Sequence, residues 1–260
     1  MTDYASLVGG LREPTPAASI LRVASAHDLA GPELPARVMV APLGRVQYQS
    51  SAGSCVAHGF SKVLENEALR RGIVAQVSRH FLYYTARLMR GWQNEDKGTT
   101  LGDMAAAIEK YGAPSEQSRP YDARTVNTPP SADLYAEAHA NRGAALRFLP
   151  ARSITAIKSS LARGLCVPFG FMVTRGYMEG TQRDGFARFD GGDLGGHCQH
   201  FVGYDDAREA FLAENSWPDF GVAHPDGGTV RAYQWFTYGS VASGAIWEAV
   251  EIVTGLPVEA

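Results

Sequence analysis

The first half of the chain has the apolar spacing of amphipathic helices. After Ser54, apolar residues follow at i, i+4, i+7 and i+8, namely Val56, Phe60, Val63 and Leu64. Ser54 is a candidate N-cap for this helix, and Gly72 is a candidate stop. Similar patterns and end signals predict four further helices, over residues 78–89 with Ser78 as cap, 101–112, 129–143 and 153–164. The first half is therefore predicted to be mainly helical.

The pattern changes at about residue 165 to short apolar or alternating runs separated by glycine and aspartate turns. These runs are typical of strands and cover residues 165–173, 195–206, 210–217 and 243–253. Residues 34–49 also read as extended, while the glycine-rich stretch 184–196 follows no phosphate-binding pattern and is predicted to be a loop. Helices followed by strands, without alternation, indicate the α+β class.

The chain length suits one large domain or two closely packed halves. We expect an N-terminal extension over residues 1–35, rich in alanine and proline and ordered only if it packs on the domain. The domain would span residues 36–260, with a helical half at about 50–150 and a β half at about 151–255. The N-terminus lacks a positive start followed by an apolar core, so no signal peptide is expected. A cytoplasmic location, or a place in a phage or secreted assembly, is expected.

Composition and charge exclude some classes of protein. Of 260 residues, 45% are hydrophobic and 20% are charged, which allows a large core and argues against disorder. The net charge is -3 without a run of like charges, so we expect no nucleic-acid partner. No apolar run approaches the ~20 residues of a bilayer span, so no membrane partner is expected. Three cysteines argue against a disulfide framework.

The stretch "QSSAGSCVAH", residues 49–58, holds a candidate nucleophile. If Ser54 caps a helix, Cys55 lies in its first turn, where unpaired amide groups and the helix dipole favour the thiolate. A buried, inert thiol is the alternative, because cysteine is among the most buried residue types. Gln49, just upstream, could donate its side-chain amide to the oxyanion of an acyl-transfer intermediate. Gln49 alone is a weak signal, because a turn glutamine is usually solvated.

A base and its orienting group are predicted further along the chain. His197 lies at the start of a predicted strand, after Gly195 and Gly196, which leave room for a ligand to approach. Strand alternation places His197 and His200 on opposite faces, so "HCQH" does not predict a zinc site, and no metal is expected. Asn215 in "ENSW" could accept the imidazole N–H, with Trp217 shielding that bond from water. The alternative is a turn asparagine beside a core tryptophan.

The order of these four residues resembles the papain family of cysteine peptidases. Gln49-x5-Cys55 is similar to the family's oxyanion glutamine and nucleophile, "HCQHFVGY" to its histidine strand, and "ENSW" to its Asn-Ser-Trp. Residues 78–91, 96–122 and 157–171 resemble segments of its bacterial and viral branches. The resemblance covers about residues 36–252. It implies a helical left half packed on a β-barrel right half, with the active-site cleft between them.

The resemblance also implies the roles of individual residues. Cys55 would attack a peptide carbonyl as a thiolate paired with the His197 imidazolium, while Asn215 orients the imidazole and no cofactor is needed. Gln49 and the Cys55 backbone N–H would hold the oxyanion. The residues expected to bind substrate are Gly53, Gly98, Thr99, Gly196 and Trp217. The implied partner is a polypeptide substrate.

The chain departs from the family's pattern at several positions. Ala52, Val56 and Pro218 stand where the family usually has a disulfide cysteine, an aromatic residue and a glycine. The first two fit a branch that is not secreted, while Pro218 could reshape the loop beside Asn215. The N-terminal extension is too short for the long inhibitory propeptide of secreted members, so we expect any latency to work in another way.

Three functions remain open from the sequence. The first is an active cysteine endopeptidase. The second is a papain-fold structural or binding component of a phage particle or secretion assembly, with weak or partner-restricted activity and a partner held through the N-terminal extension. The third is an acyl transferase that passes the acyl group to an amine. An intact set of Gln49, Cys55, His197 and Asn215 favours the first, because a scaffold has no need of all four.

Overall fold

Side-chain caps fix the start of most helices in the computed structural model, which describes residues 8–15, 33–40 and 44–254. Ser78 Oγ accepts a hydrogen bond from Phe81 N, as the sequence predicts, and Ser or Thr side chains cap five more α-helices in the same way. The α-helices of the described residues are α2 (Cys55–Arg70), α3 (Arg79–Leu88), α4 (Leu101–Tyr111), α5 (Ala132–Ala140), α6 (Ile154–Ala162), α7 (Arg175–Asp184) and α8 (Tyr238–Ala242). A short 3-10 helix, η3, spans Ala123–Thr125.

The five helices predicted from the sequence are confirmed as α2 to α6, whereas α7 and α8 were not predicted. The prediction that the Ser54 side chain caps α2 is wrong, although Ser54 does occupy the N-cap position. Ser54 occupies the position before α2, but its hydroxyl makes no cap hydrogen bond and instead contacts Tyr121 Oη at 2.7 Å. A tertiary partner therefore replaces the local cap.

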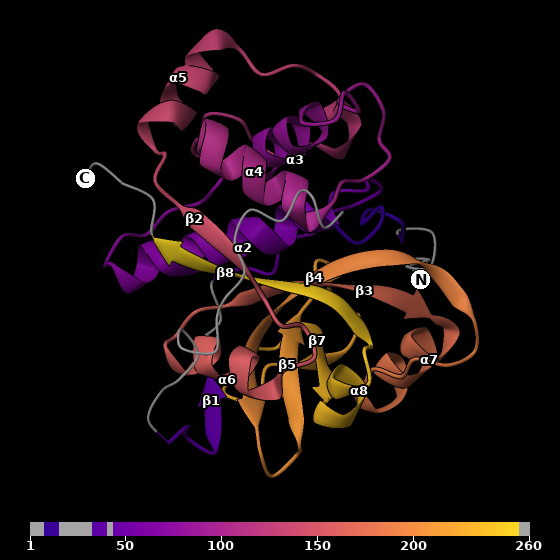
Figure 1. Ribbon diagram of the computed structural model, residues 1–260. Helices are drawn as coiled ribbons and strands as arrows, with labels where there is room; N and C mark the ends of the chain where they lie inside the picture. Colours follow the sequence, from indigo (N-terminus) through magenta and orange to yellow (C-terminus); the bar gives the residue numbers. More distant parts are fainter. Residues whose placement is uncertain (1–7, 16–32, 41–43, 255–260) are drawn as a thin grey trace.

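The strands form one antiparallel sheet that lies below the helices α2 to α5 in Figure 1. They are β1 (Arg37–Met39), β2 (Ala145–Leu149), β3 (Val167–Thr174), β4 (Asp193–Asp205), β5 (Ala210–Glu214), β6 (Val222–Ala223), β7 (Arg231–Thr237) and β8 (Ile246–Thr254). Their order is β2-β8-β3-β4-β5-β7-β6, with β1 paired to β4. The α+β class is confirmed, but the predicted barrel is not closed: among the described residues no pairing joins β2 to β6.

Two predictions of local structure need correction. The stretch 184–196 is not wholly a loop, because β4 begins at Asp193 and pairs with β3. For the same reason His197 lies inside β4 rather than at its start. The segment Ala145–Leu149 falls in the predicted helical half but belongs to the sheet as β2, paired with β8. Long-range pairing decides these segments, because their local pattern does not distinguish a strand from a turn.

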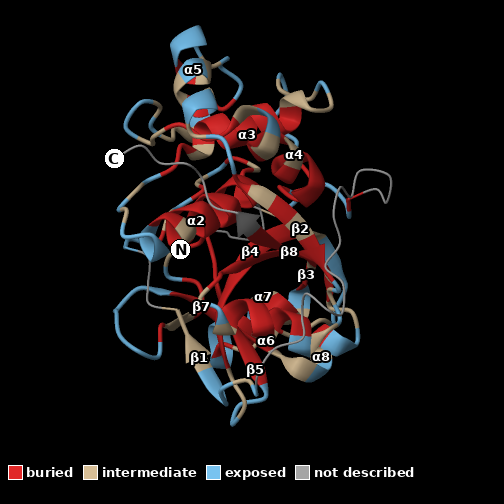
Figure 2. Cartoon of the chain, turned by 60° about the vertical axis from the view of Figure 1, so that its left-hand side comes forward, coloured by how far each residue is buried: buried red, intermediate tan, exposed pale blue. Residues whose placement is uncertain are grey.

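Two hydrophobic cores lie on the two faces of the sheet. Strand β4 alternates between them: Cys198 and Val202 belong to the core shared with α2, and Phe201 to the core on the other side. Figure 2 shows α2 and the central strands as buried, whereas much of α5 is exposed. The predicted alternation of β4 is confirmed, so α2 rests on the face that carries Cys198.

None of the helices in the described ranges combines the length and apolar character that a bilayer crossing requires. All three cysteines are free thiols and are buried.

Candidate active site

Close packing of α2 on β4 brings Cys55 to the strand that carries His197. A Cβ placed on Gly59 would lie 3.1 Å from Cys198 Sγ, a tight contact, so glycine at this position favours the close approach of the helix to the strand. Cys55 lies one helical turn before Gly59, on the same side of α2. The backbone of Cys198 hydrogen-bonds with the Cys55 thiol. The residue that follows His197 is thus in direct contact with the predicted nucleophile.

The register of the sheet brings Asn215 to His197. Strand β5 pairs with β4 through His200↔Glu214, so the next residue, Asn215, emerges beside the part of β4 that contains His197. His197 Nε2 lies 2.8 Å from Asn215 Oδ1. An amide oxygen only accepts, so Nε2 must be the donor and Nδ1 is the unprotonated nitrogen of the neutral ring. His197 Nδ1 is buried and has no hydrogen-bond partner in the described part of the chain.

Trp217 packs against the imidazole and is completely buried. Its ring stacks on His197 with centroids 4.2 Å apart. This position agrees with the prediction that Trp217 shields the His197–Asn215 bond. Trp217 is 0% exposed, as are Cys55 and His197, so its predicted place among the substrate-binding residues stays a prediction.

Gln49 is held by both sides of the site. Its Oε1 accepts hydrogen bonds from Ser216 Oγ at 2.6 Å and from Trp217 Nε1 at 3.1 Å, which fixes which end of the amide is oxygen. The amide nitrogen therefore faces the turn before Cys55, where it donates to Ala52 O at 3.0 Å. Gln49 N also donates to Ser216 O at 3.2 Å. The loop of Gln49 and the loop after β5 are thereby one hydrogen-bonded unit.

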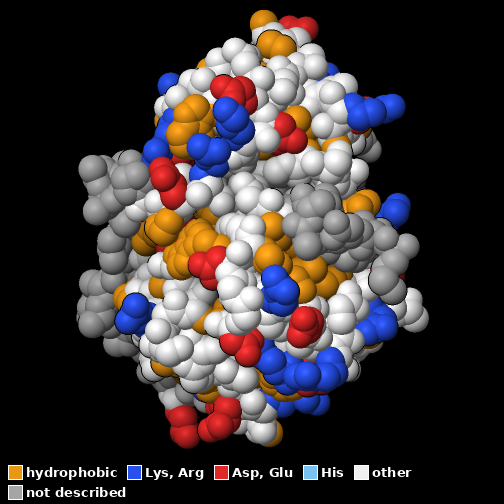
Figure 3. All heavy atoms as spheres, turned by 90° about the vertical axis from the view of Figure 1, so that its right-hand side faces the viewer, with side chains coloured by type: hydrophobic (Ala, Val, Ile, Leu, Met, Phe, Trp, Pro, Cys, Tyr) orange, Lys and Arg blue, Asp and Glu red, His pale blue; other side chains and the backbone are white. Residues whose placement is uncertain are grey.

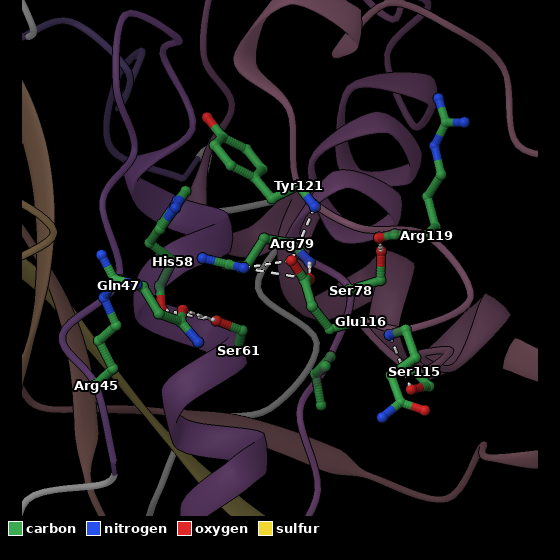
Figure 4. A network of polar contacts seen from close by, with 12 residues as sticks. Arg45, Gln47, His58, Ser61, Ser78, Arg79, Ser115, Glu116, Arg119 and Tyr121 are labelled. Atoms are coloured by element: carbon green, nitrogen blue, oxygen red, sulfur yellow. Dashed lines mark hydrogen bonds and ion pairs between the residues drawn. The ribbon is translucent and has the colours of Figure 1, made fainter.

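Tyr121 also holds this turn, and the sequence analysis missed it. Its hydroxyl donates to Gln49 O at 2.6 Å and contacts Ser54 Oγ. Figure 4 shows the network behind it, in which Arg79 pairs with Glu116 and Glu116 accepts the Tyr121 N–H at 2.8 Å. The same view shows Ser61 of α2 bonded to Gln47 of the loop, at 3.0 Å. No local pattern marks Tyr121, because its partners lie more than 60 residues earlier in the chain.

Residues 8–15 lie over the predicted nucleophile, and we call them the covering segment. A Cβ on Gly10 would lie 2.8 Å from Cys55 Sγ and 2.7 Å from Gly53 C. On the sheet side, Gly9 N donates to Gly196 O at 2.8 Å. On the helical side, Thr99 N donates to Gly10 O at 3.0 Å. The covering segment therefore contacts four of the five predicted substrate-binding residues.

Burial shifts the pKa values of both Cys55 and His197. Desolvation raises the pKa of the Cys55 thiol to about 12, although hydrogen bonds from the backbone of Cys198 and Val56 oppose the shift. Desolvation also lowers the pKa of His197 to about 4, although the hydrogen bond that His197 donates to Asn215 raises it. Both shifts favour the neutral forms of the thiol and the imidazole, because water that would solvate the charges is excluded. The thiolate–imidazolium pair stays a prediction.

The described residues contain no group of three or more His, Cys, Asp or Glu side chains that could hold a metal ion. His200, the other histidine of "HCQH", is buried on the opposite face of β4 from His197, and desolvation lowers its pKa to about 3. Its nearest acidic group is Glu214, at 4.0 Å.

His58 gives a prediction about stability. Desolvation, and then the charge of Arg79, lower its pKa to about 3 from an ordinary value of 6.5. The unfolded chain therefore binds this proton below pH 6.5 while the folded chain does not, so stability is lost as pH falls from 6.5 toward 3. One pH unit below the ordinary value, the loss is about 1.4 kcal/mol. Urea unfolding at neutral pH and at that lower pH measures it.

The pH dependence of stability includes other groups, so a variant of His58 is needed as the control for this prediction. Burial raises the pKa of Glu65 and Glu214. Their contribution to the stability of the fold is therefore lost as pH rises, which is opposite to the effect of His58. His58→Gln should remove the His58 share of the pH dependence, whereas His139→Gln, at an exposed position, should leave it unchanged. An identical pH dependence in His58→Gln and the parent chain would contradict the prediction.

The geometry agrees with the known proteins that this chain resembles. A scan against models of known protein families finds no match. A curated protein of Acanthamoeba polyphaga mimivirus, named an uncharacterized peptidase C1-like protein, is 26% identical over 182 residues, which are 65% of this chain and 58% of the viral protein. The match thus spans little more than half the length of that relative.

Solved structures extend the likeness over nearly the whole chain. Xylellain, a cysteine protease from Xylella fastidiosa, superposes with a TM-score of 0.81 at 24% identity, covering 95% of this chain and 96% of that one. Procathepsin L2 of Tenebrio molitor larval midgut gives 0.71 at 18% identity, over 98% and 81% of the two chains. A procathepsin B of Trypanosoma congolense gives 0.70 at 15%, over 98% and 89%. The chain therefore has the papain-like fold, and the resemblance to C1-like cysteine peptidases that its motifs indicate is confirmed.

Proposed function

We propose that the protein is a cysteine endopeptidase that hydrolyses polypeptides through Cys55 and His197. The observation that carries this proposal is the hydrogen bond from His197 Nε2 to Asn215 Oδ1, at 2.8 Å. It leaves His197 Nδ1 unprotonated and without a hydrogen-bond partner in the described residues, next to the strand residue that touches the Cys55 thiol. A nucleophile, a base and a group that orients the base are the parts required for acyl transfer.

The mechanism follows from these positions. Once water and substrate replace the covering segment, His197 Nδ1 takes the proton of the Cys55 thiol, and the thiolate attacks the peptide carbonyl carbon. Gln49 Nε2 and the Cys55 backbone N–H donate to the oxyanion. His197 then gives its proton to the leaving amine, which breaks the C–N bond and leaves a thioester on Cys55. A water molecule, deprotonated by His197, attacks the thioester and restores the thiol.

Two further contacts support the assignment of the base. Tyr177 Oη lies 3.3 Å from Asn215 Nδ2, which fixes the amide with its oxygen toward the imidazole. Trp217 covers the ring of His197, and the apolar contact strengthens the hydrogen bond to Asn215 by excluding water. The orientation of Asn215 favours the tautomer in which Nδ1 accepts the thiol proton, and the Trp217 contact holds the imidazole ring in place.

Covalent trapping tests the proposal. A peptidyl epoxide, applied at mildly acidic pH and followed by intact mass, should give a single adduct at Cys55. The other thiols are the internal reference, because an ordinary thiol with a pKa of ~8.5 is nearly unreactive at such pH. Labelling at Cys55 that is no faster than at Cys166 or Cys198, in a variant from which residues 8–15 have been removed from the site, would refute the nucleophile. Digestion of a peptide library by the same protein then separates a general endopeptidase from a structural component with restricted activity.

A further inference from the structure

The hydroxyl of Tyr177 lies where four parts of the fold meet behind the His197–Asn215 pair. Tyr177 belongs to α7, and three side-chain amides surround its Oη: Gln199 of β4, Asn215 after β5 and Gln234 of β7. Gln199 Nε2 lies 2.6 Å from this oxygen, Asn215 Nδ2 3.3 Å and Gln234 Oε1 3.4 Å. All four residues are buried, so these polar groups depend on one another for hydrogen bonds.

Packing holds the Tyr177 ring, and with it the hydroxyl, in one place. The first turn of α7 is fixed by the hydrogen bond that Tyr177 N donates to Thr174 Oγ1 at 3.1 Å. The ring packs among three aromatic rings whose centroids lie 5.1, 5.8 and 6.3 Å away, those of Phe171, Phe220 and Phe236. Side chains in such close-packed surroundings keep one rotamer. The hydroxyl is therefore a fixed point beside which the neighbouring amides are oriented.

The contact with Tyr177 fixes the Asn215 amide only if the hydrogen of the hydroxyl points elsewhere. A phenolic hydroxyl has one hydrogen to donate and lone pairs that accept, so it can pair with either end of an amide. If its hydrogen pointed at Asn215, the amide oxygen would turn toward Tyr177 and the NH₂ group toward His197. His197 would then accept at Nε2 and carry its proton on Nδ1, the nitrogen that the proposed base needs free. The direction of one hydrogen atom thus sets the tautomer of His197.

Gln234 supplies the acceptor that draws this hydrogen away from Asn215. Gln234 Nε2 donates to the backbone oxygen of Phe220 at 2.6 Å, and a carbonyl oxygen can only accept. The other end of the amide, Oε1, therefore faces Tyr177 and accepts its O–H. The lone pairs of Tyr177 Oη are then left for the NH₂ groups of Gln199 and Asn215. The orientation of Gln234 is thereby passed on to the site.

The result is a chain of hydrogen bonds in which every bond runs in the same sense. The donors and acceptors follow one another from His197 Nε2 to Asn215, from Asn215 to Tyr177, from Tyr177 to Gln234 and from Gln234 to Phe220 O. Bonds arranged in this way polarise one another, and reversing any one of them requires reversing its neighbours. The backbone carbonyl at the end cannot be reversed, so it gives the whole chain its direction.

We propose that Tyr177 and Gln234 are positioning residues, which set the tautomer of His197 through a hydrogen-bond chain that ends on a backbone carbonyl. The inference rests on the proposed function for its effect on the reaction rate, whereas the tautomer is a property of the folded chain and is measured without a substrate. Neither residue touches the reacting atoms. Both act through Asn215, which is the group in contact with the imidazole.

Gln234→Met in the full chain is the central test. Methionine fills a similar space but lacks the amide acceptor, so the Tyr177 hydrogen turns to Asn215 and the Asn215 amide turns over. The proton of His197 should then move from Nε2 to Nδ1. Proton–nitrogen NMR spectra at neutral pH, with isotope-labelled histidine, show which ring nitrogen carries it, and His197→Gln identifies the signals. The ratio of the Nε2–H to the Nδ1–H tautomer should fall by roughly tenfold, the worth of about one hydrogen bond.

Tyr177→Phe should have a smaller effect, although Tyr177 is the residue bonded to Asn215. Without the hydroxyl neither end of the amide is preferred, so both tautomers of His197 should be present in comparable amounts. The double variant Tyr177→Phe/Gln234→Met should have the same ratio as Tyr177→Phe, because Gln234 acts only through the hydroxyl. In all three variants kcat for a fluorogenic peptide should follow the Nε2–H fraction while KM stays unchanged.

Thr181→Val and Tyr204→Phe are the matched controls. Thr181 lies one turn after Tyr177 on α7 and interacts with its hydroxyl but is not a member of the chain, so its loss should leave the tautomer ratio unchanged. Tyr204 is a buried ring whose hydroxyl donates to Pro35 O at 2.7 Å. Tyr204→Phe should lower the thermal midpoint about as much as Tyr177→Phe does, without a change of tautomer.

The variants also decide against the proposal if it is wrong. An unchanged ratio in Gln234→Met would overturn it, and so would an equal shift in Thr181→Val, since Tyr177 would then have another acceptor. A lower ratio in the double variant than in Tyr177→Phe would show that Gln234 acts by packing, which also overturns it. If the ratios shift as expected but neither the parent chain nor any variant hydrolyses a peptide, the hydrogen-bond chain stands and the proposed endopeptidase function fails.

Discussion

Cys55→Ala is expected to reduce peptide hydrolysis by roughly 10⁴-fold or more, because the covalent route is lost together with the nucleophile. Cys55 is the first residue of α2 and is completely buried, so the substitution removes one sulfur atom without disturbing a surface contact. The measurement is kcat/KM for a fluorogenic peptide, compared with the parent chain at equal protein concentration. Since the thiol forms its bond to the substrate only in the reaction step, binding of the peptide should change little.

Cys166→Ala is the matched control for this substitution. Cys166 is also completely buried and also free, but its backbone N–H bonds to Asn66 and it takes no part in the proposed chemistry. Its loss should leave kcat/KM within about twofold, apart from a small cost in stability. Equal losses of activity in the two variants would show that the rate reflects packing and not a nucleophile. Residual hydrolysis in Cys55→Ala at the parent rate would remove Cys55 from the mechanism.

Gln49→Ala is expected to lower kcat by about 10²–10³-fold with little change in KM, because one oxyanion donor is typically worth that factor. The oxyanion exists only in the transition state and the intermediate, so its donor raises kcat rather than substrate affinity. The side chain of Gln49 is completely buried and is fixed by Ser216 and Trp217, which is the preorganisation that such a donor requires. Steady-state kinetics with the same fluorogenic peptide measure the two constants.

Gln47→Ala is the control for Gln49. Gln47 lies two residues earlier on the same loop, but its amide contacts Ser61 and Glu65 of α2, on the side away from Cys55. The loss of Gln47 should affect the thermal midpoint more than kcat. If Gln47→Ala and Gln49→Ala lower kcat by the same factor, the effect comes from a loosened loop, and the oxyanion role of Gln49 is refuted.

Seen from the right-hand side of Figure 1, hydrophobic side chains gather across the middle of the molecule, with a few charged side chains among them (Figure 3). Among the exposed large hydrophobic residues, Leu194 lies at the start of β4, three residues before His197. The expectation that the N-terminal extension is ordered only if it packs on the domain lies partly outside the described residues, because 1–7 and 16–32 are not described. Residues 8–15 do pack, on the site itself.

Local signals were enough for the helices that carry their own start and stop residues. Ser78 and the glycine after Tyr111 mark α3 and α4, and the apolar stripe of Val56, Phe60 and Val63 marks α2. Helix α7 escaped prediction because its sequence, "RGYMEGTQRD", holds two glycines and few apolar residues. The N-cap hydrogen bond that Tyr177 N donates to Thr174 Oγ1, and the fully buried Tyr177 ring, stabilise it instead.

The closure of the sheet could not be read from the sequence either. Alternation in β4 shows which side chains share a face, but not whether the first and last strands of a sheet meet. Pairing of β2 with β8 joins residues about 100 positions apart, and no local pattern encodes it. The same holds for Tyr121, whose bond to Gln49 O depends on the path of the chain between α4 and α5.

The sequence by itself determined the chemical groups, their order along the chain and the helix that begins at Cys55, because these follow from residue type and from contacts within a few residues. Only the tertiary structure decided that His197 Nε2 faces Asn215, and that Gln49 is locked by Ser216. It also decided the burial of the site, which raises the pKa of the Cys55 thiol and lowers the pKa of His197. Burial depends on which distant segments pack together, and residue order alone does not contain that information.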